Sequence, residues 1–167
     1  EASTGEVDED LPAWTGESPQ RDEGGLDSME SSELDDFEAA KRDFDKASTF
    51  VGEGQFEQAI PLLERAAKTD QDNEEIHYHL AFSLSRIGRT EEAIEHYTKT
   101  LEIFPDYAEA RVNLGNLLMN QGSFQEAEEA FRAALDVAPE LASVHNNLGT
   151  LLSRQSRVVE AIPLFVE

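Results

Sequence analysis

The sequence contains no cysteine among its 167 residues. This absence excludes disulfide bonds and thiolate chemistry, and it is compatible with a reducing compartment such as the cytoplasm. Long apolar runs are missing as well, since none approaches the ~20 residues that a membrane-spanning helix needs. The sequence has no glycine-rich phosphate loop followed by lysine, and no Gly-x-Ser-x-Gly elbow. We therefore expect no enzyme activity in these residues, no cofactor and no membrane partner.

Positive charge is also scarce. Lysine and arginine total 13 against 36 acidic residues, which gives a formal net charge of −23. Proteins that bind nucleic acids place clustered lysine and arginine against the phosphates. The composition therefore predicts that this chain has no nucleic-acid partner.

The acidic residues are concentrated at the N-terminus, where residues 1–39 hold 14 of them and a single basic residue. Such a segment cannot bury enough apolar surface to offset the entropy of ordering. Residues 1–34 are therefore predicted to form a disordered acidic tail, and Ser31 or Ser32 is the expected N-cap of the first helix. Trp14, the one tryptophan, is either a short docking motif or an exposed side chain in a linker.

The most informative feature is a repeat with a period of 34 residues. The stretch NLGNLLMNQGSFQEAEEAF, which begins at Asn113, recurs one period later as NLGTLLSRQSRVVEAIPLF. Extending this register gives four rows: 40–73, 74–107, 108–141 and 142–167. Residues of one kind recur in fixed slots of these rows, which are Ala47, Ala81, Gly115 and Gly149; Gly54, Gly88, Gly122 and Ser156; Ala59, Ala93, Ala127 and Ala161; and Leu63, Tyr97, Phe131 and Phe165.

Each slot has a role in a pair of antiparallel helices. Apolar residues at helical spacing occupy both halves of a row, and the glycine slot between them suits a left-handed residue that ends a helix. The small slots let the two helices approach closely, and the large slot fills the space toward the next pair. Because one pair cannot bury its own apolar faces, the pairs must stack. The pattern predicts an all-α protein.

These residues resemble the tetratricopeptide repeat family. The resemblance implies a right-handed superhelical stack of helix pairs over residues 35–167. Rows three and four, with their NLG segments, resemble the repeats of the O-linked N-acetylglucosamine transferase family. Row one is the weakest, with Lys46 where later rows have leucine, and row four stops inside its second helix. Because a repeat array needs polar end caps, we expect further repeats or another domain beyond residue 167.

The resemblance also implies that the first helix of each row lines a concave groove. The slots that face inward hold Phe44, Asp45 and Ser48 in row one; Tyr78, His79, Phe82 and Arg86 in row two; Val112, Asn113, Asn116 and Asn120 in row three; and Asn146, Asn147, Thr150 and Arg154 in row four. From these we expect the peptide-binding residues to be Phe44, Tyr78, His79, Phe82, Arg86, Asn113, Asn116, Asn120, Asn146, Asn147 and Arg154.

Asn113 and Asn147 occupy the same slot in adjacent rows. A side-chain amide can bond the backbone of a peptide whatever the peptide's side chains are. The pair therefore resembles the asparagine ladder of the transferase repeats, with His79 and Asp45 interrupting it in the earlier rows. The alternative is that the two asparagines satisfy local polar groups or recur because the repeat was duplicated.

Two other kinds of site are not expected. A second binding mode of the family clamps the C-terminal carboxylates of a chaperone, but Glu109 in one of the corresponding slots would repel a carboxylate. His77 and His79 are two residues apart on a helix, so they point to different faces and do not form a metal site.

The sequence thus favours a non-enzymatic scaffold that binds an extended peptide segment of a protein partner in its groove. The alternative is that these residues are the substrate-recruiting part of a larger enzyme, such as a glycosyltransferase, whose catalytic domain lies beyond residue 167. Neither hypothesis places catalysis within the 167 residues.

Overall fold

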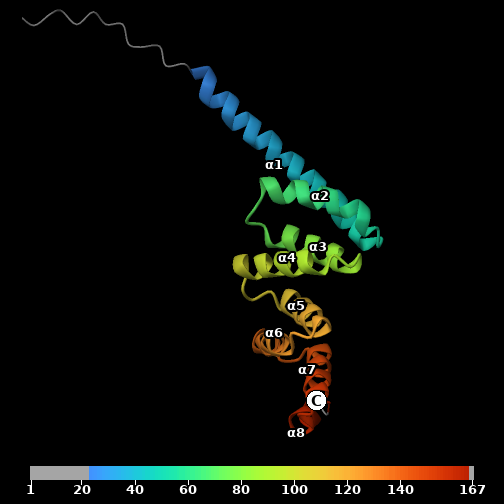
Figure 1. Cartoon of the computed structure of the whole chain (residues 1–167). Helices are drawn as coiled ribbons and strands as arrows, with labels where there is room; N and C mark the ends of the chain where they lie inside the picture. The colour runs from blue at the N-terminus through green and yellow to red at the C-terminus, as the bar shows by residue number, and fades with distance from the viewer. Residues whose placement is uncertain (1–22, 166–167) are drawn as a thin grey trace, which may run out of the picture.

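The computed structural model describes residues 23–165, with side chains described from residue 31 onward. Within these residues the chain forms α-helices and one 3-10 turn and contains no strand, so the all-α prediction is confirmed (Figure 1). The helices are α1 (Glu23–Gly52), α2 (Phe56–Thr69), α3 (Glu74–Arg86), α4 (Thr90–Ile103), α5 (Ala108–Gln121), α6 (Phe124–Val137), α7 (Ala142–Arg154) and α8 (Val158–Ala161), and the 3-10 turn η1 spans Ile162–Phe165.

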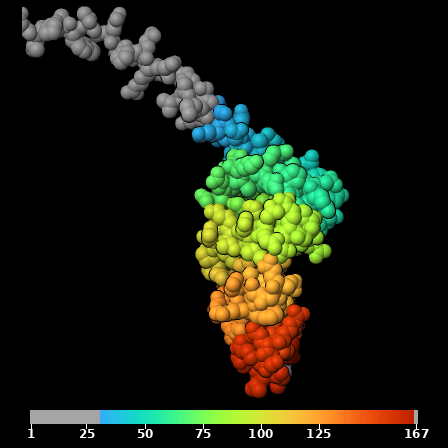
Figure 2. Space-filling model, viewed as in Figure 1, coloured from blue at the N-terminus to red at the C-terminus, as the bar shows by residue number. Residues whose placement is uncertain are grey.

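The helices form successive pairs that stack into an elongated body. Each first helix packs on the second helix that follows it, and each second helix packs on the first helix of the next pair. Figure 2 shows the pairs as layers that follow one another in chain order from α1 to α8. This arrangement is the one that the 34-residue period predicts, because each repeat contacts only its neighbours.

The turns between paired helices use the left-handed conformation that the glycine slot predicts. Gly54, Gly88 and Gly122 have φ angles of 74°, 82° and 86°, and Ser156 occupies the same slot with a φ of 63°. A residue with a Cβ is strained in this region, whereas glycine is not. The fourth pair thus has the same turn as the other three, but its Ser156 is strained in this conformation whereas their glycines are not.

The small slots bring the paired helices into close contact with a large side chain. A Cβ added to Gly115 would lie 2.7 Å from Cε1 of Phe131, and one added to Gly149 would lie 2.6 Å from Cζ of Phe165. Phe131 is fully buried, as is Tyr97 in the equivalent slot of the second pair. At Gly115 and Gly149 the approach of an aromatic ring therefore leaves no room for a Cβ, whereas the second pair accommodates Ala81 in this slot beside Tyr97.

The N-terminal boundary differs from the prediction. Helix α1 begins at Glu23, so neither Ser31 nor Ser32 is its N-cap, and the boundary expected at residue 34 falls inside a helix. Side chains 31–38 are exposed, so this part of α1 extends away from the packed pairs. Once the packed part of α1 has formed, each further residue adds a backbone hydrogen bond without a new nucleation step, which lets the helix continue. The rest of the predicted tail, residues 1–22 with Trp14, lies outside the described residues.

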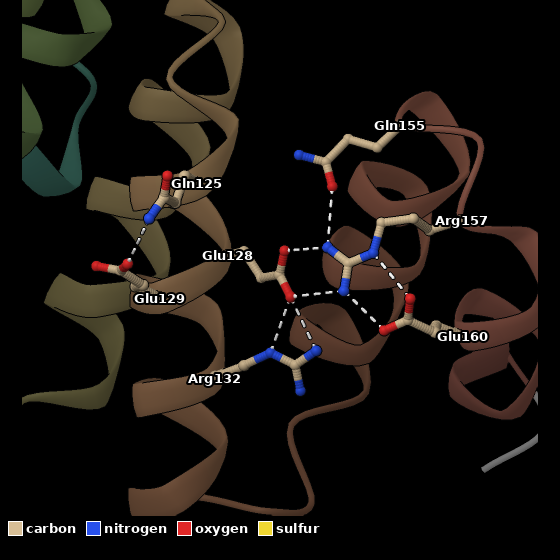
Figure 3. Close-up of polar contacts among 7 residues, drawn as sticks. All are labelled: Gln125, Glu128, Glu129, Arg132, Gln155, Arg157 and Glu160. Atoms are coloured by element: carbon tan, nitrogen blue, oxygen red, sulfur yellow. Dashed lines mark hydrogen bonds and ion pairs between the residues drawn. The ribbon is translucent and has the colours of Figure 1, made fainter.

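A cluster of ion pairs joins the third and fourth pairs. The guanidinium group of Arg157, in the turn after α7, donates to the carboxylates of Glu128 on α6 and Glu160 on α8 (Figure 3). Arg132 also donates to Glu128, at 2.8 Å, so this carboxylate lies between two cations. The hydrogen bonds from Arg157 and Arg132 lower the pKa of Glu128. The cluster links two repeats through their turn and second helices and leaves the first helices free of it.

Candidate groove on the first helices

The first helices form the inner side of the stack. Helix α1 contacts α3, α3 contacts α5, and α5 contacts α7. Within residues 23–165, the second helices α2, α4 and α6 make no such contacts with one another. A stack whose first helices lie closer together than its second helices curves toward the first helices, so these line the concave face.

The second repeat contributes an aromatic cluster to this face. The ring of Tyr78 stacks on that of Tyr107 with centroids 4.8 Å apart, and it meets the ring of His79 edge-on at 5.7 Å. The His79 ring in turn meets that of Phe44 across the first and second repeats, at 5.4 Å. All four side chains are partly exposed.

A second aromatic contact lies at the other end of α3. The ring of Phe82 meets that of Phe56 at 5.8 Å, and the guanidinium carbon of Arg86 lies 5.6 Å from the centroid of the Phe56 ring. The Phe82 ring also stacks on Tyr78, at 6.5 Å. The aromatic residues therefore run the length of α3.

The third and fourth repeats contribute amides. Nδ2 of Asn113 donates to the hydroxyl of Tyr78, 35 positions earlier, at 3.3 Å. Nδ2 of Asn147 donates to Oδ1 of Asn116, 31 positions earlier, at 2.7 Å. Each bond crosses from one repeat to the next, so the two predicted ladder residues lie in a polar strip that continues the aromatic cluster.

The remaining predicted residues are less constrained. Asn120, Asn146 and Arg154 are exposed, and within the described part of the chain no hydrogen bond of their side chains joins them to the strip. The residues that the structure does connect through rings or hydrogen bonds are Phe44, Tyr78, His79, Phe82, Asn113, Asn116 and Asn147, with Arg86 resting on Phe56.

Tyr107 and Phe104 belong to the cluster but were not predicted. The Phe104 ring meets that of Tyr107 at 6.0 Å, and the Phe104 side chain is 47% exposed. Both residues lie in the loop between α4 and α5, outside the first-helix slots from which the site was read. Their aromatic character beside Pro105, at the close of a row, was the available signal.

The tyrosines of the aromatic cluster are influenced by acidic side chains at the beginning of α3 and α5. Burial, the neighbouring hydroxyl of Tyr78 and the carboxylates of Glu109, Glu75 and Glu74 raise the pKa of Tyr107 to about 12. Burial and Glu109 also raise the pKa of Tyr78. The N-terminal ends of α3 and α5 are therefore negative beside the aromatic cluster.

The histidines serve local packing. Nε2 of His77 donates to the carbonyl of Gln71 at 3.0 Å, and in this tautomer Nδ1 of His77 accepts from Nδ1 of His96, also at 3.0 Å. His79 points to the groove and donates from Nδ1 to the carbonyl of Glu75 at 2.8 Å. Across the described residues, no three histidine, aspartate or glutamate side chains are placed to hold a metal ion. The same residues include no helix long and apolar enough to cross a membrane.

Comparisons with known proteins agree with the observed repeats. The family model described as tetratricopeptide repeat matches residues 50–96 and 87–152. Among solved structures, a crystal structure of MamA is 21% identical with a TM-score of 0.74, covering 75% of this chain and 74% of that chain. A second MamA structure, AMB-1, is 26% identical with a TM-score of 0.69, covering 75% and 69% of the two chains.

A third similar structure contains a ligand. The first TPR of Spaghetti (RPAP3), bound to the HSP90 peptide SRMEEVD, is 16% identical with a TM-score of 0.68, covering 72% of this chain and 95% of that chain. At this level of identity the likeness concerns the fold alone. A search of curated protein sequences finds no match to this chain.

Proposed function

The chain belongs to the tetratricopeptide repeat family, and from this premise we propose that it is a protein-interaction scaffold that binds an extended peptide along its first helices. The observation that carries the proposal is the strip of polar and aromatic side chains that crosses three repeats. It runs from Tyr78 through Asn113 and Asn116 to Asn147 on successive first helices. The same fold holds a peptide in the Spaghetti structure, which supports a peptide as the class of ligand.

The amides suggest the mode of binding. Asn113 and Asn147 each use Nδ2 toward a neighbouring repeat, and the side-chain amide of Asn113 also interacts with the hydroxyl of Tyr97. Each amide carries an Oδ1 acceptor with two lone pairs. A ligand's backbone N–H can donate to these oxygens whatever its side chain is. The ladder-type contact of the O-linked N-acetylglucosamine transferase repeats is therefore the mode that we propose for rows three and four.

A double variant tests this function. Changing Asn113→Ala and Asn147→Ala together should weaken the binding of peptides of unrelated sequence by a similar factor. The loss should be about 1–2 kcal/mol per residue, because a buried ligand group would lose its partner. The measurement is a fluorescence titration with labelled pools of random, uncharged peptides.

The matched control is the pair Gln58→Ala and Gln125→Ala. These side chains carry the same amide but lie on the second helices α2 and α6. The control should bind every pool as the wild type does, and thermal unfolding of both variants should show an intact fold. Equal affinity of the asparagine variant and the control would refute the proposed mode.

The alternative of a substrate-recruiting part of a larger enzyme is not proposed, because no feature of the described residues favours it over a free-standing scaffold. Both would use the groove in the same way. Binding by the first helices is therefore the property to establish.

A further inference from the structure

One end of the groove combines aromatic rings with acidic side chains. The rings of Tyr78, Tyr107 and Phe104 form a continuous contact, with centroid distances of 4.8 Å and 6.0 Å. Glu75, on α3, and Glu109, on α5, are exposed at the beginning of these helices. We call these five residues the tyrosine patch.

We propose, on the basis of the peptide-binding function above, that the tyrosine patch binds an arginine or lysine side chain of the ligand, so that the partner is a basic peptide segment. A cation is attracted to the face of an aromatic ring and to nearby carboxylates, and the two attractions add. The exposed Phe104 ring offers such a surface beside the partly exposed Tyr107, while the ring of Tyr78 is stacked on those of Tyr107 and Phe82.

The carboxylates of Glu75 and Glu109 influence the tyrosine hydroxyls electrostatically. Glu109 raises the pKa of both tyrosine hydroxyls, after burial as the main cause, and Glu75 contributes at Tyr107. Each carboxylate therefore lies within electrostatic reach of at least one tyrosine hydroxyl. The structure gives neither carboxylate an ion pair among the described residues, so both charges are available to a ligand.

His79 adds a hydrogen-bond acceptor beside the rings. Its Nδ1 donates to the carbonyl of Glu75 at 2.8 Å, and in the tautomer that makes this bond Nε2 is the acceptor. The ring lies edge-on to Tyr78 at 5.7 Å. The His79 ring is thus a further polar group next to the tyrosine patch.

Within the described residues, the nearby cations form no ion pair with the carboxylates of the patch. Arg111, on the first turn of α5, donates twice to the carbonyl of Pro105 and lines a hollow with Ile94 and Leu118, between α4, α5 and α6. Arg86 rests on Phe56 at the opposite end of α3. Lys41 occupies the slot of Glu75 and Glu109 in the first repeat, so the charge in this slot is positive on α1 and negative on α3 and α5.

The negative charge of the chain favours a basic peptide over a second copy of the chain or an acidic peptide. With a net charge of −23, a second copy of the chain would be repelled, and so would an acidic peptide. The clamp for C-terminal carboxylates is unfavourable for the same reason, because Glu109 stands in one of its slots. A basic segment is attracted both by the whole chain and by the patch.

The test uses three peptide pools in which random, uncharged residues flank one fixed central residue. The fixed residue is arginine, citrulline or glutamate, where citrulline has the shape of arginine without its charge. The wild-type chain should bind the arginine pool about three- to tenfold more tightly than the citrulline pool at low salt, and the glutamate pool most weakly. The preference should shrink as salt is added, because salt screens exposed charges.

Two double variants assign the preference to the patch. Glu75→Gln with Glu109→Gln should bring the ratio of arginine to citrulline affinity close to one. Glu126→Gln with Glu129→Gln removes the same charge from α6 and should leave the ratio unchanged. Thermal unfolding should show that both variants are folded.

The outcomes separate this inference from the function on which it rests. If all pools bind equally and all weaken in the Asn113→Ala, Asn147→Ala variant, the groove binds peptides but the basic partner is wrong. A preference for glutamate, or an arginine preference that survives loss of Glu75 and Glu109, also overturns the inference. If no pool binds, both the inference and the proposed function fail.

Discussion

At the level of single residues, Gly115 shows how closely the paired helices approach. The space for a Cβ is already occupied by the ring of Phe131, at 2.7 Å, and that ring is fully buried. The Phe131 ring cannot move away without displacing other core residues. The small slot was predictable from the repeat, because glycine or alanine recurs there in every row. The large side chain that contacts Gly115 could not be predicted, because the spacing of residues in the sequence gives no distances between residues on different helices.

Replacing Gly115 with alanine should lower the free energy of unfolding by about 1–3 kcal/mol, because the added methyl group overpacks the contact with Phe131. The measurement is urea unfolding followed by circular dichroism. The first repeat provides the matched pair, since it has Ala47 and Leu63 in these slots. The double variant Gly115→Ala, Phe131→Leu should therefore be more stable than the sum of the two single changes predicts. Strict additivity would contradict the contact.

The repeat slots locate the proposed groove residues only in part, and their role in binding stays a prediction. Asn113, Asn147 and Tyr78 follow from slots in the repeat, and the structure joins them to neighbouring repeats. The hydrogen bond from Asn147 to Asn116 could not be predicted, because it depends on the side-chain rotamers of two different helices. Tyr107 was missed because it lies in a loop, where repeat slots carry no information about direction.

At the level of helices, α3 and α4 are joined by a pair of histidines. Nδ1 of His77 and Nδ1 of His96 lie 3.0 Å apart, and only one proton fits between them. Burial, and then the neighbouring His77, lowers the pKa of His96, while Glu92 opposes and Arg89 adds to this effect. The fold therefore holds His96 neutral at a pH where an exposed histidine becomes charged.

This linkage predicts a loss of stability on acidification. Above the unfolded pKa of His96, about 6.5, the residue is neutral in both states and makes no difference. As the pH falls below that value, the unfolded chain takes up a proton that the folded chain does not, so the free energy of unfolding decreases until the lower, folded pKa is reached. Urea unfolding at pH 7.5 and pH 5.5 measures the change.

The matched variant is His96→Gln, which cannot take up this proton. It should lose less stability than the wild type between the two pH values. The depressed pKa values of Glu92 and Glu128 act in a separate and more acidic window, because the ordinary pKa of glutamate is 4.5. An equal loss in the wild type and the variant would mean that His96 is not the group that responds.

The helix boundaries also show where sequence reasoning succeeded and where it failed. The four turns were predicted correctly, because one slot recurs at the period of the repeat, with glycine at Gly54, Gly88 and Gly122 and serine at Ser156. The start of α1 was not, because the serines that suggested a cap lie in a helix that continues to Glu23. A cap signal is local, whereas helix length depends on nucleation elsewhere in the helix.

At the level of the whole molecule, the 34-residue period predicted the stack of helix pairs. The stack in turn orients the groove along the first helices. Stacked pairs place the first helices side by side, so residues 34 apart become neighbours on one surface. The ligand does not follow from this geometry, because a repeat surface accepts many partners. The proposals about its chemistry therefore depend on particular side chains, of which Tyr78, Asn113 and Asn147 are the most direct.

Side-chain amide resonances measure the central claim most directly, since a chain of 18.6 kDa suits solution NMR. On titration with the arginine-containing peptide pool, the NH2 signals of Asn113, Asn116 and Asn147 should shift and saturate together. Those of Gln58 and Gln125, on the second helices, should not. Saturable shifts at Gln58 and Gln125 with none at the three asparagines would contradict peptide binding along the first helices.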